Sequence, residues 1–105
     1  MFHLSLEKFT TPEQRDKWVP LSLQYDIHGC YAQTEIGHGS DVSGLMTTAT
    51  YDKKTDEFVI HTPDPKATKW WPGELGRYAN WALVFAQLVI PDDGEMNTYT
   101  VAPFL

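Results

Sequence analysis

Hydrophobic and polar positions change their spacing once along the chain, near residue 26. Before that point Trp18, Leu21 and Tyr25 recur at three- and four-residue intervals, which is typical of one face of a helix. Residues 11–14, Thr-Pro-Glu-Gln, predict the start of this helix, because they combine an N-cap threonine, a proline at the first helical position and a capping-box glutamine. Pro20 interrupts the stripe, so we expect a kink or an early end near residue 19.

After residue 26, short strand patterns alternate with turn signals. The predicted strands cover residues 28–34, 45–51, 57–62, 79–90 and 97–105. The polar turn at residues 52–56 joins the second and third strands into a hairpin. Several short strands at near-regular spacing favour a barrel or a sandwich. We therefore expect a mainly β fold, an antiparallel β-barrel or sandwich preceded by a short N-terminal helix, in a single domain over residues 1–105.

Composition and charge narrow the possible classes of protein. The 105 residues are 42% apolar, which is enough for one globular domain. Eight Lys and Arg against 14 Asp and Glu give a net charge of −6, which argues against nucleic acid or an anionic membrane as a general partner. The longest apolar run, residues 81–90, is shorter than the roughly 20 residues of a membrane span. The last predicted strand reaches residue 105 without a polar tail, so we expect a chain truncated from a larger protein.

Common catalytic and metal-binding patterns are not convincing here. Glu35 and His38 have i, i+3 spacing, but no second ligand pair is nearby, so we interpret them as solvated loop residues and expect no metal. Ser40 lacks the glycine that a nucleophile elbow needs two positions before it. Cys30 lies within a predicted strand, where a buried small side chain is the ordinary interpretation.

Two irregular segments, residues 34–44 and 69–76, interrupt the strand-rich sequence. The first carries the hydroxyls of Thr34 and Ser40, and the second carries the adjacent Trp70 and Trp71. A flat aromatic ligand with polar edges would use such a combination of rings and hydrogen-bonding groups. The residues alone leave a second interpretation open, in which the two tryptophans belong to the core.

These same segments carry a family resemblance. Residues 29–41, Gly-Cys-Tyr-Ala-Gln-Thr-Glu-Ile-Gly-His-Gly-Ser-Asp, closely resemble the middle domain of peroxisomal acyl-CoA oxidases. Residues 47–52, 57–63 and 69–76 follow in the order and spacing of that family, so the resemblance covers nearly the whole chain. It implies the middle β-barrel domain of an FAD enzyme of peroxisomal fatty acid β-oxidation. Such enzymes oxidise acyl-CoA to trans-2-enoyl-CoA and reduce oxygen to hydrogen peroxide.

The resemblance also implies partners that this chain does not contain. Family members have further helical domains, one of which supplies the catalytic glutamate, and we expect the parent enzyme to be a homodimer. No residue of this chain is therefore assigned a catalytic role. We expect the isolated chain to be inactive and to hold FAD weakly or not at all.

Four residues correspond to binding positions of the family. Thr34 matches the threonine that hydrogen-bonds the flavin, and Gly73 matches a glycine that contacts the flavin from the second segment. Trp71 matches a tryptophan that packs near the isoalloxazine ring. Ser40 matches a serine near the pantetheine arm of acyl-CoA.

Position 73 also bears on the choice between oxidase and dehydrogenase. Related acyl-CoA dehydrogenases carry a hydroxyl residue where this sequence has Gly73, and we hypothesise that the smaller residue leaves room for oxygen. An aspartate at position 41 is found in dehydrogenases, so Asp41 does not support the oxidase branch. The alternatives are therefore the middle domain of an acyl-CoA dehydrogenase and a non-catalytic β-barrel binding module.

Overall fold

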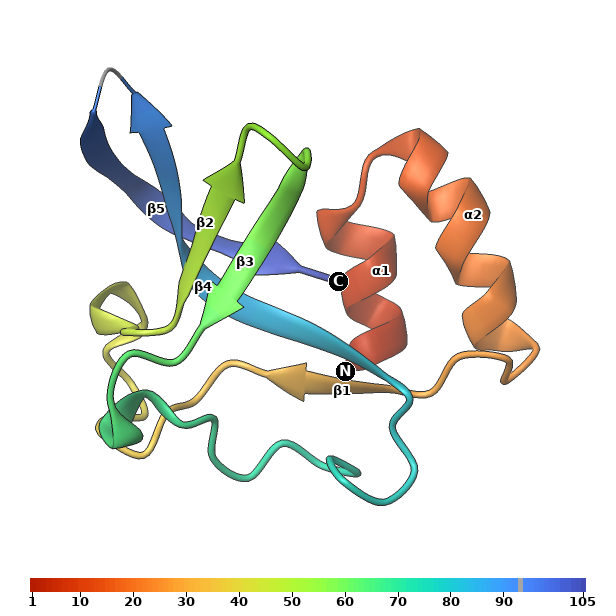
Figure 1. Ribbon diagram of the computed structural model, residues 1–105. Coiled ribbons are helices and arrows are strands. Elements are labelled where there is room, and N and C mark those ends of the chain that lie inside the picture. Colours follow the sequence, from red (N-terminus) through yellow and green to blue (C-terminus); the bar gives the residue numbers. More distant parts are fainter. Residues whose placement is uncertain (93) are drawn as a thin grey trace.

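Two helices precede a five-stranded mixed sheet in the computed structural model, which describes residues 1–92 and 94–105 (Figure 1). The helices are α1 (Phe2–Phe9) and α2 (Pro12–Leu23). The strands are β1 (Gly29–Ala32), β2 (Thr48–Asp52), β3 (Glu57–His61), β4 (Trp81–Asp92) and β5 (Glu95–Phe104), with short 3-10 turns at η1 (Val42–Gly44) and η2 (Pro65–Ala67).

The N-terminal helical region, α1 and α2, is longer than the sequence predicts. α2 begins as expected, because the Thr11 hydroxyl accepts from the Gln14 amide and the Gln14 side chain accepts from the Thr11 amide. It continues through Pro20 to Leu23, so an early end near residue 19 is wrong, while the alternative of a kink there stays a prediction. None of the residues of α2 is buried, and the carbonyl that Pro20 leaves without a helical donor can turn to water. α1 was not predicted at all.

The long strand β4 organises the sheet. It pairs in parallel with β1 and with β2, and antiparallel with β5, while β2 and β3 form the predicted antiparallel hairpin. Val84 pairs with both β1 and β5, and Gln87 pairs with both β2 and β5. A strand has only two edges, so β1 and β2 must lie end to end along one edge of β4, opposite β5.

This topology corrects the expected fold class. The sheet is mixed rather than antiparallel, it is not closed into a barrel, and it is accompanied by two helices (Figure 1). Alternating hydrophobicity marks strands but carries no information about their direction, so the two parallel pairings had no sequence signal.

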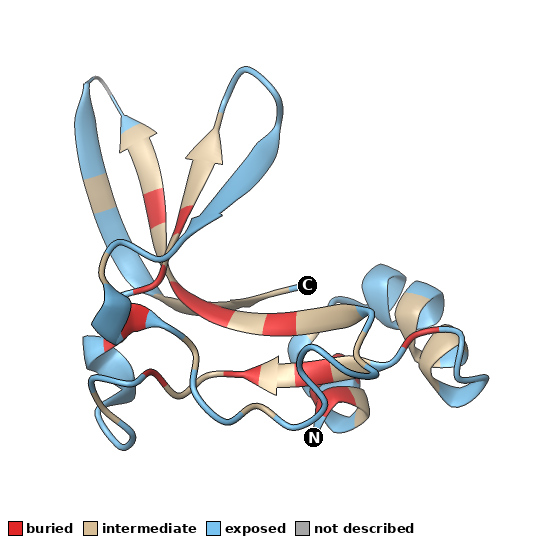
Figure 2. Cartoon of the chain, turned by 60° about the horizontal axis from the view of Figure 1, so that its bottom comes forward, coloured by how far each residue is buried: buried red, intermediate tan, exposed pale blue. Residues whose placement is uncertain are grey.

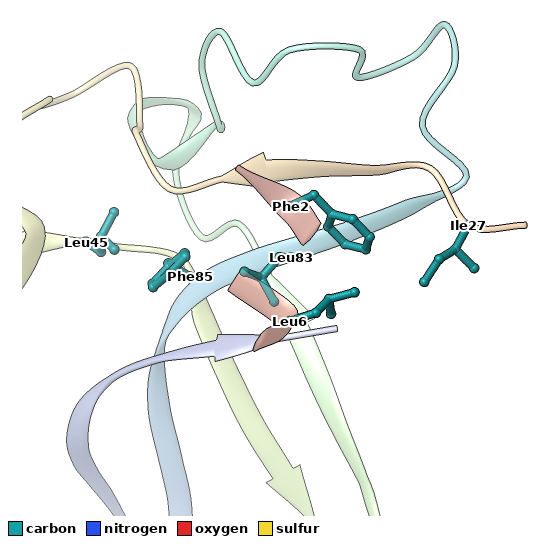
Figure 3. Close-up of a cluster of buried hydrophobic side chains, with 6 residues drawn as sticks. All are labelled: Phe2, Leu6, Ile27, Leu45, Leu83 and Phe85. Carbon is teal, nitrogen blue, oxygen red and sulfur yellow. The ribbon is translucent and has the colours of Figure 1, made fainter. Parts of the chain in front are cut away.

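The core lies where α1 meets β1 and β4. Phe2 and Leu6 stand one helical turn apart on α1 and pack against Leu83 and Phe85 of β4, together with Ile27 and Leu45 (Figure 3). Buried residues are concentrated in this region, whereas every residue of β3 is exposed (Figure 2). At the margin, the Trp18 and Trp81 rings lie 4.8 Å apart and attach α2 to the start of β4.

Gly29 provides a test of this packing. A Cβ atom at Gly29 would lie 2.0 Å from two ring carbons of Phe2, which is itself 7% exposed. Gly29→Ala should therefore force the ring from its site and lower the free energy of unfolding by about 1–3 kcal/mol. Gly39→Ala is the matched control, because a Cβ atom there meets nothing within 4 Å. Urea unfolding of both variants measures the difference, and equal midpoints would contradict the assignment.

Candidate functional site

The two irregular segments lie side by side and are hydrogen-bonded to each other. The amide of Trp70 donates to the carbonyl of Thr34 at 2.9 Å, and the amide of Ile36 donates to the carbonyl of Thr68 at 3.0 Å. Between these bonds, Glu35 and Lys69 stand opposite each other in an antiparallel bridge. Segments separated by more than 30 residues in the sequence therefore form one short two-stranded unit at the end of β1.

One face of this unit borders a cavity of about 830 Å³. Thr34 of the first segment and the preceding Gln33 line it, and the second segment contributes residues 70–74. The remaining wall comes from β1, from the start of α1 and from the end of α2 with the loop that follows it. Figure 1 shows the second segment running alongside β1 on its way to β4.

The tryptophans of the second segment are not core residues. Trp70 is 60% exposed and Trp71 is 77% exposed, and both line the cavity. Trp71 adopts a φ of 52° and Glu74 a φ of 68°, in the left-handed region that side-chain-bearing residues rarely occupy. A bulky ring held outward in such a conformation costs on the order of 1 kcal/mol or more and is a feature of ligand-binding loops.

Gly73 has no structural requirement to be glycine. Its φ is not in the left-handed region, and a Cβ atom at this position would meet nothing within 4 Å. Neither backbone conformation nor crowding within the described chain explains the absence of a side chain. Glycine at this position instead leaves the space beside the cavity open.

Ser40 does not join the other candidate residues. Thr34, Trp71 and Gly73 line the same cavity, whereas Ser40 is exposed outside that lining, next to η1. Its neighbour Asp41 has a local structural role, because its carboxylate accepts from the Ser43 hydroxyl at 2.9 Å and from the Gly44 amide at 3.1 Å. Asp41 is therefore explained as the cap of η1.

Glu35 was interpreted from the sequence as a solvated loop residue, and this was wrong. It is 1% exposed, and its carboxylate accepts from the Met46 amide at 2.8 Å, the Thr47 amide at 2.9 Å and the Thr47 hydroxyl at 2.6 Å. His38 approaches the second carboxylate oxygen to 3.4 Å through Nε2. Burial opposes ionisation of Glu35, but these donors and Lys69 outweigh it and lower its pKa from 4.5 to about 2.

Lys69 supplies the positive charge opposite Glu35. Its ammonium donates to the Glu35 carboxylate at 3.1 Å, to the Gln33 carbonyl at 2.9 Å and to the Phe85 carbonyl at 2.7 Å. Three acceptors match the three protons of an ammonium group. Burial lowers the pKa of Lys69, and the Glu35 carboxylate opposes that change.

Sequence reasoning missed this pair and the helical part of the cavity wall. A charged residue among loop glycines resembles a solvated one, and the cation that neutralises Glu35 is 34 positions away.

Cys30 is 2% exposed, as its strand position predicted. Within residues 1–92 and 94–105 no three His, Cys, Asp or Glu side chains gather in a way that could hold a metal ion. None of the helices in the described part of the chain is long and apolar enough to cross a membrane.

Comparison with known proteins relates this geometry to a family. No protein-family model matches the chain. Peroxisomal acyl-coenzyme A oxidase 1 of Arabidopsis thaliana is 56% identical over 89 residues, which are 85% of this chain and 13% of that protein. The chain is homologous to acyl-CoA oxidases.

Solved structures agree with this relationship. An acyl-CoA oxidase from tomato superposes with a TM-score of 0.90 at 50% identity, over 99% of this chain and 15% of its own. Acyl-CoA oxidase-2 of Caenorhabditis elegans, bound with FAD, ascaroside-CoA and ATP, gives a TM-score of 0.91 at 46% identity, again over 99% and 15%. The chain thus spans about one seventh of the length of these oxidases.

The charge of Glu35 predicts a dependence of stability on pH. The folded state lowers the pKa of Glu35 from 4.5 to about 2, so the resulting stabilisation is fully present above pH 4.5 and is lost as the pH falls towards 2. The full effect is about 3 kcal/mol. Urea unfolding between pH 6 and pH 3 should show a falling free energy of unfolding for the unmodified chain. The double variant Glu35→Gln with Lys69→Met, which leaves no unpaired charge in the interior, should lose less stability on acidification; parallel curves would contradict the assignment.

Proposed function

We propose that this chain is the middle, FAD- and acyl-CoA-binding segment of a peroxisomal acyl-CoA oxidase. The observation that carries the proposal is the meeting of Thr34, Trp71 and Gly73 in the lining of one cavity, from segments far apart in the sequence. These are the residues that correspond to flavin-binding positions of the homologous family. The names of the relatives, which describe peroxisomal enzymes, support the same compartment for this one.

The cavity fits a flat cofactor. Its volume of about 830 Å³ is in the range of small-molecule sites, and it combines the exposed rings of Trp70 and Trp71 with the hydroxyl-bearing Thr34. FAD bound there would supply the redox chemistry, accepting a hydride from the β-carbon of acyl-CoA and passing electrons to oxygen. Thr34 would hydrogen-bond the ring edge, Trp71 would pack beside the ring, and Gly73 would leave the adjacent space free.

Ser40 belongs to the acyl-CoA part of the proposal. It is exposed and lies outside the cavity lining, which suits contact with an extended pantetheine arm rather than with the ring. No residue of the chain is assigned as the base that removes the α-proton. That role falls to a glutamate in a helical domain of the complete enzyme.

The surface of the sheet supports a place within a larger enzyme. Phe58, Val59 and Ile60 of β3 are all more than 40% exposed, and Tyr99 of β5 is 60% exposed. Exposed apolar surface of this kind marks contact sites. We propose that residues 1–105 form part of the middle β-barrel domain, that helical domains of the enzyme cover this surface, and that the enzyme is a homodimer.

A chimeric enzyme tests the function directly. Residues 1–105 would replace the homologous segment of the Arabidopsis oxidase, with which they share 56% identity over 89 residues. The purified chimera should contain FAD and produce hydrogen peroxide when acyl-CoA is added. Thr34→Val should weaken FAD binding about fivefold, the effect of losing one hydrogen bond, whereas Thr55→Val in the exposed β2–β3 turn should not. A folded chimera without flavin or peroxide would refute the proposal.

Gly73→Thr tests the oxidase assignment in the same chimera. The substitution meets open space, so the free energy of unfolding of the 105-residue chain should stay within about 0.5 kcal/mol of the unmodified value. In the chimera, stopped-flow measurement should show slower reoxidation of reduced flavin by oxygen, because the added side chain fills the space beside the ring. Unchanged reoxidation would contradict the role of Gly73. Slow reoxidation without any substitution would favour the dehydrogenase alternative.

A further inference from the structure

The Glu35–Lys69 pair occupies an interruption in the sheet. β1 pairs with β4 as far as Val84, and β2 begins its pairing at Gln87, so Phe85 lies between them with no partner from β1 or β2 on this edge. The Lys69 ammonium takes the place of a strand amide there, donating to the Phe85 carbonyl at 2.7 Å. Beyond this position the ordinary backbone pairing resumes, because the Gln87 amide donates to the Thr47 carbonyl at 2.8 Å.

The pair also determines which side chains face the cavity. Glu35 and Lys69 are opposite each other in the antiparallel bridge and point together into the interior, where their side chains are 0% and 11% exposed. Successive side chains in extended backbone point to opposite faces. Thr34, which precedes Glu35, and Trp70, which follows Lys69, accordingly lie on the other face, and both line the cavity.

A shift of one residue would reverse this arrangement. A shift of the first segment would turn Thr34 to the interior, and a shift of the second would turn Trp70 there. Either shift would leave one buried charge without its partner. Removing one member of a buried ion pair destabilises a fold strongly, because the other charge is left uncompensated. A pair of this kind therefore specifies alignment even where its net contribution to stability is small.

We propose that Glu35 and Lys69 are positioning residues that fix the alignment of the two cavity segments. The buried pair ties both segments to β4 and sets Thr34 and Trp70 on the cavity face. The consequence for FAD rests on the proposed function, whereas the alignment itself does not. Neither Glu35 nor Lys69 lines the cavity, so both act on it through their neighbours in the sequence.

The test uses a variant that removes both charges, because either single substitution leaves an unpaired buried charge and can prevent folding. Glu35→Gln with Lys69→Met keeps the approximate side-chain volumes and electrical neutrality of the interior. Lys66→Met is the matched control, because Lys66 lies three residues before Lys69 in η2, is exposed, and makes no ion pair with Glu35. Lys69→Arg, which retains the charge, serves as the rescue variant.

Amide hydrogen exchange on the 105-residue chain reports the alignment. The informative amides are those of Ile36, Gly37 and Trp70, whose hydrogen bonds of 2.9–3.0 Å join residues 34–37 to residues 66–70. In the double variant their exchange should accelerate at least tenfold while amides of the β2–β3 hairpin keep their rates. Lys66→Met should leave all of them unchanged, and Lys69→Arg should restore most of the protection. Unchanged protection of the three amides in the folded double variant would overturn the proposal.

FAD affinity in the chimera reports the consequence for the site. Titration of the apo form with FAD should show at least tenfold weaker binding for the double variant, and near-normal binding for Lys69→Arg and Lys66→Met. Accelerated exchange with unaltered FAD affinity would overturn the positioning role. If the unmodified chimera binds no FAD, the proposed function fails, and the alignment is then decided by hydrogen exchange alone.

Discussion

The ammonium group of Lys69 holds together the part of the molecule on which the rest is arranged. It joins three pieces of backbone: the Gln33 carbonyl just after β1, the second cavity segment to which Lys69 itself belongs, and β4 through the Phe85 carbonyl. Glu35 neutralises it and in turn receives the two amides and the hydroxyl that lead into β2. β1 and β2 pair with the same edge of β4 and leave Phe85 unpaired between them. Without Lys69, the buried Phe85 carbonyl would have no hydrogen-bond donor on this edge, which is costly.

Local structure was largely predictable because its causes are local. The capping box at Thr11 and the β2–β3 hairpin involve residues within a few positions of one another, and both were confirmed. The direction of β1 relative to β4 depends on a crossover of about 50 residues, and no pattern within either strand records it. α1 was missed for a related reason. Its buried apolar residues, Phe2 and Leu6, span only one helical turn, and its stability comes from packing on β4.

The candidate site was half predictable. The resemblance predicted Thr34, Trp71, Gly73 and Ser40 as binding residues, and the fold brings the first three to one cavity and places Ser40 outside its lining. The supporting pair escaped notice because charge in a loop is ordinarily solvated, and burial of Glu35 is decided by Thr47 and Lys69 rather than by its neighbours. Residues that contact a ligand recur in recognisable motifs, whereas residues that support them are defined only by tertiary contacts.

The strained backbone of the second cavity segment lies next to the residues that support it. Among the described residues, left-handed backbone outside glycine occurs at Tyr25, Asp56, Trp71 and Glu74. Trp71 and Glu74 lie in the exposed segment that lines the cavity, and the Glu35–Lys69 bridge lies immediately before that segment. Strain in a loop persists only where the adjoining structure fixes the ends of that loop. Lys69 provides the anchor at one end, and at the other Asn80 binds the turn before β1 through the His28 amide at 2.7 Å and the Asp26 carbonyl at 3.2 Å. A strained segment held between two such anchors can present an indole ring to a ligand without first ordering itself, which reduces the entropic cost of binding.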